Sequence, residues 1–231
     1  MIFTADTIAS QITRLLQGYP DLAVLQSDST MVRLHGHVLV FRTHNDFTLR
    51  KIYALDIVIP VCSAELPYVI DTGRQISQDY HHYYPNGMLC LETDTRIRIR
   101  FVDGFDLTAW MLEFVEVYYF TYEYYERFGT FPFGERSHGI LGIIQTYQDL
   151  LRTKEEVETY KLMHFIQDRA YRGHHPCPCD SGKSLRKCHG QAMLRFYKDI
   201  RIKKIMIDDL IVLDTEFAKE RDRERNRRKT E

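Results

Sequence analysis

The sequence predicts an α+β fold in which an antiparallel meander sheet is flanked by helices and followed by a small cysteine-rich segment with helices of its own. Apolar residues recur at helical spacing near the start of the chain, and runs rich in β-branched and aromatic residues then alternate with short turns. Helical periodicity returns after residue 107. Strands joined by short turns pair in antiparallel fashion, and such a sheet needs helices over one face.

The composition is that of a soluble globular protein. With 231 residues, of which 44% are apolar, the chain is long enough for one domain and a smaller appendage. We place the domain at residues 1–160 and the appendage at 161–231. The net charge of -1 gives no overall attraction to nucleic acid or membrane, and we expect neither partner. Neither a signal-peptide pattern nor a membrane-length apolar run is present, so we expect a cytoplasmic location.

The first half of the chain contains one helix and three strands. Apolar residues at 8, 12, 15 and 16 predict an amphipathic helix over 5–16, which Gly18 and Pro20 end. Strands are expected at 31–42, 47–59 and 68–70, with turn residues at 43–46. Arginine alternates with apolar residues over 95–102, which favours an edge strand protected by charge; a surface for phosphates or an acidic partner is the alternative.

The second half is predicted to be helical. The aromatic segment 107–128 is apolar nearly all round, which indicates a buried helix rather than a cofactor-binding or base-stacking site. Further helices are expected at 140–151, 154–172 and 202–217. The tail 219–231 alternates in charge, which is typical of a solvated helix end or a disordered segment rather than a nucleic-acid arm.

Four residues near the C-terminus have the spacing of a metal site. Cys177 and Cys179 are separated by one residue, and the adjacent pair Cys188 and His189 follows eight residues later. Three thiolates and an imidazole are the set that a closed tetrahedral zinc site requires. With all four positions filled, the site has no place for a catalytic water, so we expect a structural zinc ion, with His175 as the reserve ligand.

The segment 173–190 resembles the SEC-C motif, the small zinc-binding tail known from the protein-translocation ATPase SecA. The resemblance implies Cys177, Cys179, Cys188 and His189 as ligands. It also implies a docking role toward another protein or the ribosome.

Cys90 is the candidate nucleophile. It follows a Pro-Asn-Gly turn signal and has leucine on either side, in the stretch His82-Tyr83-Tyr84-Pro85-Asn86-Gly87-Met88-Leu89-Cys90-Leu91. A buried, inert thiol is the alternative, and we expect that state for Cys62. We expect ordinary structural roles for the histidines at 35, 37, 44 and 164.

The order of elements and the loop itself resemble bacterial members of the ubiquitin-conjugating enzyme family over about residues 4–151. The local match is His82, Pro85, Asn86-Gly87 and Leu89-Cys90-Leu91, with the segments 57–60 and 66–69 similar to the family's strand and proline element. The resemblance implies that Cys90 carries an acyl group as a thioester and that His82 supports it. The asparagine expected two positions after the histidine is replaced by Tyr84. Either the Tyr84 hydroxyl replaces the amide as the oxyanion donor, or transfer is slow or differently assisted.

Three functions follow as hypotheses. The first is a ubiquitin-conjugating-like transferase, whose implied partners are a ubiquitin-activating-like enzyme, a ubiquitin-like protein or cGAS-like nucleotidyltransferase, and a target protein, as in antiphage operons. The second is a non-enzymatic adaptor that uses the zinc module and the conjugating-like domain for recognition. The third is a thiol hydrolase that pairs Cys90 with His138.

Overall fold

The computed structural model describes residues 3–230 and divides into two compact units. The N-terminal unit comprises the chain up to Glu92 together with Asp103–Glu135, and the C-terminal unit comprises Thr93–Val102 and the chain from Arg136 onward. This division differs from the boundary expected at 160/161, which falls inside a helix. The reason is that the helices on both sides of that boundary contribute to one apolar core of the C-terminal unit.

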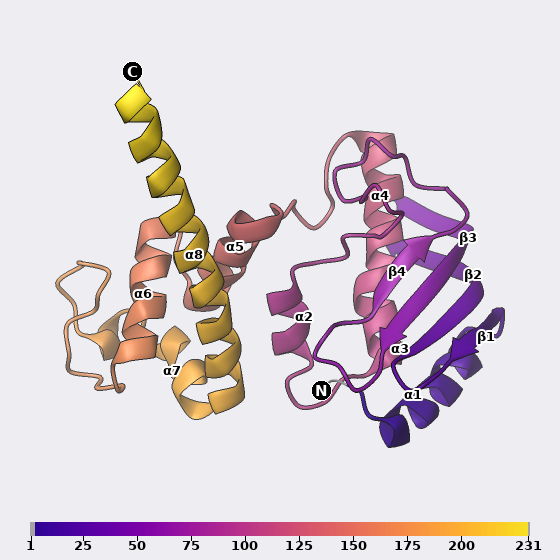
Figure 1. Ribbon diagram of the computed structural model, residues 1–231, viewed down its shortest axis with the longest axis horizontal. Helices are drawn as coiled ribbons and strands as arrows, with labels where there is room; N and C mark the ends of the chain where they lie inside the picture. Colours follow the sequence, from indigo (N-terminus) through magenta and orange to yellow (C-terminus); the bar gives the residue numbers. More distant parts are fainter. Residues whose placement is uncertain (1–2, 231) are drawn as a thin grey trace. The chain divides into compact units, whose positions relative to one another are not determined.

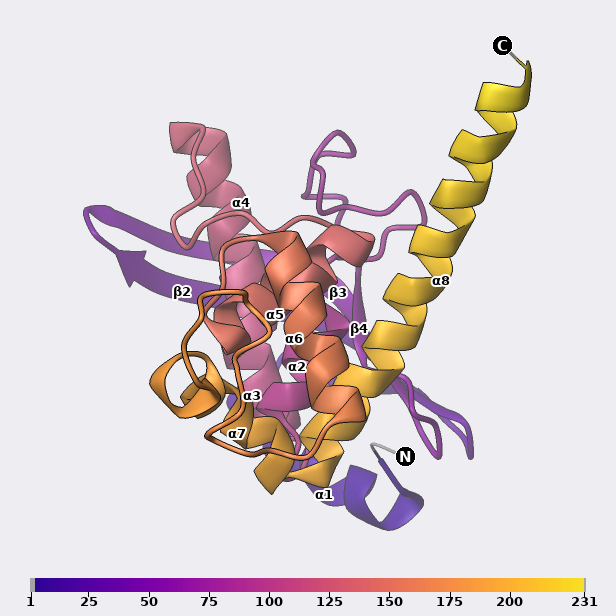
Figure 2. The ribbon, with the colours of Figure 1, turned by 90° about the vertical axis from the view of Figure 1, so that its left-hand side faces the viewer.

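The N-terminal unit contains an antiparallel meander with strand order β1-β2-β3-β4 (Figure 1). The strands are β1 (Leu22–Ser27), β2 (Met31–His44), β3 (Phe47–Pro60) and β4 (Tyr68–Asp71). β2 and β3 form a long hairpin in which Met31 pairs with Pro60 and His44 with Phe47 (Figure 2). The α+β class and the meander are therefore confirmed; β1 was not predicted.

Helices cover the inner face of this sheet. The helix α1 (Ala5–Gly18) begins at the Thr4 cap and contacts α3 (Leu107–Trp110). A π-helical turn, Met111–Val115, connects α3 with α4 (Glu116–Phe128). α4 packs on β2 and β3, where the rings of Tyr53 and Tyr119 stack 4.0 Å apart and are fully buried. The aromatic segment is thus a core helix, as predicted.

The C-terminal unit consists of helices around a second core. They are α2 (Asp94–Arg100), α5 (Gly139–Leu151), α6 (Glu156–Asp168), a 3-10 turn (Leu185–Lys187), α7 (Gly190–Lys198) and α8 (Ile200–Thr230). α6 and α8 lie side by side, and their apolar faces share the core with Leu185 and Cys177 (Figure 2). α8 extends through most of the charged tail; residue 231 lies outside the described residues.

The segment predicted as a basic edge strand is the helix α2, so that prediction was wrong. Thr93 caps the helix, and its hydroxyl accepts a hydrogen bond from the Arg96 amide. Asp94 lies in the first turn and Arg98 and Arg100 in the last, the charges that suit the two ends of a helix. In so short a segment, the alternation of arginine with apolar residues is compatible with either a strand or a helix.

The helices within residues 3–230 lack an apolar stretch of the length that a bilayer requires.

Candidate functional site

The loop that bears Cys90 is attached to the edge of the sheet. The Leu89 amide donates to the Val69 carbonyl over 3.0 Å, and the Asp71 amide donates to the Gly87 carbonyl over 3.0 Å. An antiparallel bridge also joins Ile70 with Met88. The loop therefore continues the ladder beyond β4, and Leu89 is buried against the core.

The Pro-Asn-Gly sequence forms the predicted turn. The Tyr84 amide donates to the Met88 carbonyl and the Gly87 amide donates to the Tyr84 carbonyl, each over 2.9 Å. Gly87 has φ +85°, and a Cβ there would lie 3.2 Å from Ile70 Cγ2. The Asn86 side chain accepts from the Met88 amide, so Asn86 is a turn residue.

Cys90 and His82 lie together at the base of this turn. The Cys90 amide donates to the His82 carbonyl over 2.9 Å, and a ring nitrogen of His82 lies within 4.8 Å of Cys90 Sγ. Cys90 is half-buried, while Cys62, which was expected to be buried, is exposed. Cys62 comes just after β3 with φ +56°, where the chain turns and leaves the core. The structure thus brings two of the three predicted catalytic residues together.

Tyr84, the third, lies in the turn with 45% of its surface exposed. Its backbone closes the turn, and a role for its hydroxyl stays a prediction.

Aromatic residues that the sequence reasoning missed support the His82–Cys90 pair. The Tyr118 hydroxyl donates to the His82 carbonyl over 2.9 Å. Tyr80 packs on Tyr118, and the His82 ring lies 5.4 Å from Tyr80 and 5.9 Å from Phe131. Burial raises the pKa of both Tyr80 and Tyr118 far above the ordinary tyrosine value, so both phenols keep their protons at physiological pH. These contacts join distant parts of the chain, and no local sequence signal indicates them.

His138, the proposed partner of a thiol hydrolase, belongs to the C-terminal unit, so the pairing with Cys90 stays a prediction.

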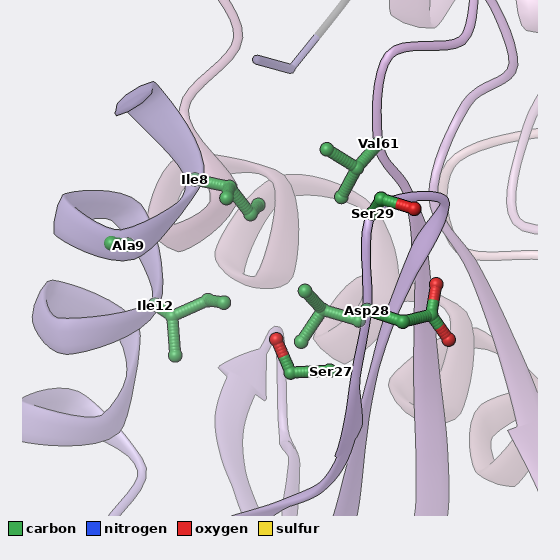
Figure 3. A pocket seen from close by; sticks show the side chains of 8 residues that line it. Ile8, Ala9, Ile12, Ser27, Asp28, Ser29 and Val61 are labelled. Atoms are coloured by element: carbon green, nitrogen blue, oxygen red, sulfur yellow. The ribbon is translucent and has the colours of Figure 1, made fainter. Parts of the chain in front are cut away.

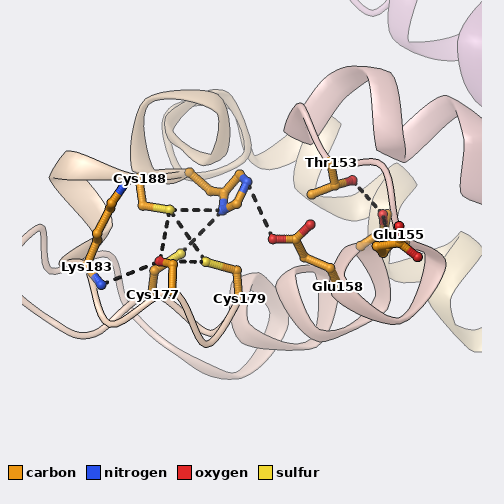
Figure 4. A network of polar contacts seen from close by, with 10 residues as sticks. Thr153, Glu155, Glu158, Cys177, Cys179, Lys183 and Cys188 are labelled. Atoms are coloured by element: carbon orange, nitrogen blue, oxygen red, sulfur yellow. Dashed lines mark hydrogen bonds and ion pairs between the residues drawn. The ribbon is translucent and has the colours of Figure 1, made fainter.

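The four predicted metal ligands converge in the C-terminal unit (Figure 4). Their ligand atoms all lie within 4.8 Å of one another. His189 Nδ1 is 3.5 Å from Cys177 Sγ and 3.4 Å from Cys188 Sγ, and the sulfurs of Cys179 and Cys188 are 3.5 Å apart. Tetrahedral zinc with bonds of about 2.3 Å requires ligand separations of about 3.8 Å. The cluster can therefore hold a metal ion.

A short hairpin and a 3-10 turn position these ligands. The Cys177 amide donates to the Lys183 carbonyl over 2.8 Å, and Gly182, with φ +70°, reverses the chain. Cys188 directly follows the 3-10 turn, and His189 occupies the N-cap position of α7. His175 lies at the base of the hairpin and is not part of the cluster found among residues 3–230.

The thiols of the cluster differ in acidity. Burial raises the pKa of the Cys177 thiol to about 12. Burial also acts to raise the pKa of Cys179, but hydrogen bonds with Ser181, and further ones with Cys177 and Cys188, outweigh burial and lower this pKa to about 6. Ser181 Oγ lies 3.1 Å from Cys179 Sγ. Because metal ligation requires thiolates, binding must release the proton of Cys177.

A shallow hollow lies between α1 and the β1–β2 turn (Figure 3). Ile8 of α1 points toward Val61 across it, and Ile12 points toward the side formed by Ser27 and Asp28. Its lining includes no residue of the Cys90 loop or of the cysteine cluster.

Comparison of the chain with family models, with curated proteins and with solved structures gave no match.

Proposed function

We propose that the N-terminal unit is a ubiquitin-conjugating-like transferase in which Cys90 carries an acyl group. The observation that supports this most is the placement of a half-buried thiol beside His82, on a loop that is hydrogen-bonded to the sheet edge. A thiolate attacks a carbonyl without a strong neighbouring base and is also a good leaving group, which suits a residue that must both accept and release an acyl group.

The proposed reaction has two steps. The Cys90 thiolate attacks the thioester that an activating enzyme holds, so that a new sulfur–carbonyl bond forms and the enzyme's thiolate leaves. An amine of the target then attacks the Cys90 thioester; the carbon–nitrogen bond forms, Cys90 leaves as a thiolate, and the amine loses its proton to solvent. The donor is a ubiquitin-like protein or a cGAS-like nucleotidyltransferase with a free C-terminal carboxylate, and antiphage defence is the proposed setting in the cytoplasm.

The test is a loading assay with an activating enzyme, ATP and each donor, analysed with and without reducing agent. We expect an adduct that reducing agent cleaves with the wild type, none with C90A, and a reductant-resistant ester with C90S. C62S is the matched control, since Cys62 is the more exposed thiol of the same unit, and it should load normally. An adduct that persists in C90A removes Cys90 from the mechanism. Loading by none of the donors favours the adaptor hypothesis.

We infer that the cluster in the C-terminal unit holds zinc in a structural, SEC-C-like role. Cys177, Cys179, Cys188 and His189 supply the three sulfurs and one nitrogen that zinc prefers, and a closed set of four leaves no position for a reacting water. Bound there, zinc would fix the hairpin and the 3-10 turn for docking to a partner. Elemental analysis should give one zinc ion per chain, and a metal content far below this value rejects the ligand set.

A further inference from the structure

The two ring nitrogens of His189 face different neighbours. Nδ1 faces the thiols of Cys177 and Cys188, at 3.5 and 3.4 Å. Nε2 faces helix α6, where it lies 3.8 Å from Oε1 of Glu158 (Figure 4). The His189 and Glu158 side chains are only 16% and 26% exposed, so this contact is partly shielded from water.

A second contact joins the same face of α6 to the turn of the hairpin. Lys161, one turn after Glu158, places Nζ 2.6 Å from Oδ2 of Asp180, the residue after Cys179. Leu162, the next residue of α6, is buried in the core that also contains Cys177. α6 therefore contacts the ligand His189 and the neighbour of the ligand Cys179, although it lies outside the motif that supplies the ligands.

We propose that Glu158 is the outer partner of the metal ligand His189. In the metal-bound state the carboxylate accepts a hydrogen bond from Nε2–H, which fixes the tautomer whose Nδ1 lone pair points into the cluster. A metal ion at Nδ1 would make Nε2–H a stronger donor, so the present separation of 3.8 Å between Nε2 and Glu158 Oε1 should shorten to a hydrogen bond on loading. Glu158 is thus a positioning residue, and α6 is part of the metal site. This inference rests on the metal centre proposed above.

The test is competition for zinc between the full-length protein and a chromogenic chelator at pH 7. Removal of an outer partner typically weakens metal binding about 10- to 100-fold, and we expect a loss of this size for E158A and a smaller one for E158Q, which keeps an acceptor oxygen. Glu156 is an exposed residue of the same helix. E156A, which removes the same charge, is the matched control and should bind zinc like the wild type.

The second readout is the ¹⁵N NMR spectrum of His189 in the zinc-loaded protein. We expect a metal-bound Nδ1 and a protonated Nε2, with the Nε2 resonance shifted in E158A but not in E156A. Equal zinc affinities of E158A and E156A, or coordination through Nε2, overturn the role of Glu158 and leave the zinc site standing. A wild-type protein that binds no zinc overturns both.

Discussion

The Tyr118 hydroxyl and the Cys90 amide donate to the same acceptor, the carbonyl oxygen of His82, each over 2.9 Å. Tyr118 comes from helix α4, whereas His82 and Cys90 belong to the loop at the sheet edge. The conformation of the candidate site is therefore fixed partly by a helix that is distant in sequence.

Replacement of Tyr118 by phenylalanine should loosen this loop. Y118F keeps the buried ring but removes the hydroxyl, and loss of one hydrogen bond should lower the free energy of unfolding by about 0.5–1.5 kcal/mol. Urea denaturation measures this loss, and faster alkylation of Cys90 by iodoacetamide reports the opening of the loop. Y68F is the control, because no hydroxyl hydrogen bond of Tyr68 is found among residues 3–230. Equal stability and equal alkylation rates of Y118F and Y68F would show that the hydrogen bond from Tyr118 to the His82 carbonyl does not stabilise the loop.

Y84F should separate the two steps of the proposed reaction. If the Tyr84 hydroxyl stabilises the oxyanion that forms when an amine attacks, its loss should slow transfer about 100-fold. Formation of the Cys90 thioester should change little, because Y84F keeps the two backbone hydrogen bonds with which Tyr84 closes the turn. Single-turnover discharge of preloaded protein to free lysine measures the transfer step. Unchanged discharge would mean that another group supplies the donor.

Zinc binding should weaken as the pH falls. Burial raises the pKa of Cys177 to about 12, so this thiol is protonated before ligation and must release its proton to the solvent. One released proton raises the Kd for zinc about tenfold for each pH unit lost. Chelator competition between pH 8 and pH 6 gives the slope. A Kd that does not depend on pH would contradict ligation by Cys177.

The elements with strong local signals could be predicted from the sequence. The β2–β3 hairpin has a long β-rich pattern with a polar turn, and the cysteine cluster has its ligands within thirteen residues. The strand β1 gave no such signal, because only Leu22 of its six residues is buried and no alternation results. The segment of α2 alternates arginine with apolar residues, which led to the prediction of a strand, whereas Thr93 caps a helix there.

The outer partners of both sites could not be predicted. Glu158 lies 31 positions before His189, and Tyr118 lies 28 positions after Cys90. Each is a single polar residue in a helix. The apolar periodicity of such a helix predicts which face is buried, but not which residue a polar side chain contacts. Their contacts depend on how the helices pack, which the amino-acid pattern of one segment does not contain.

Asp28 should make stability depend on pH at the β1–β2 turn. Hydrogen bonds lower the pKa of its carboxyl from 3.8 to about 2, first of all from the Thr30 hydroxyl and then from the Thr30 amide, the Gln26 side chain and the Met31 amide. Because folding lowers this pKa, the ionised group stabilises the folded protein above pH 3.8, and this contribution is lost as the pH falls toward 2. At pH 7, D28A should therefore unfold at a lower urea concentration than the wild type. The difference between their urea midpoints should become smaller below pH 3.8. Asp46 is an exposed residue of the β2–β3 turn, and D46A is the matched control, which should show no such narrowing. The same difference in urea midpoint between D28A and the wild type at pH 7 and at pH 3 would contradict this prediction. It would show that the protonated carboxyl of Asp28 stabilises the turn as well as the ionised one.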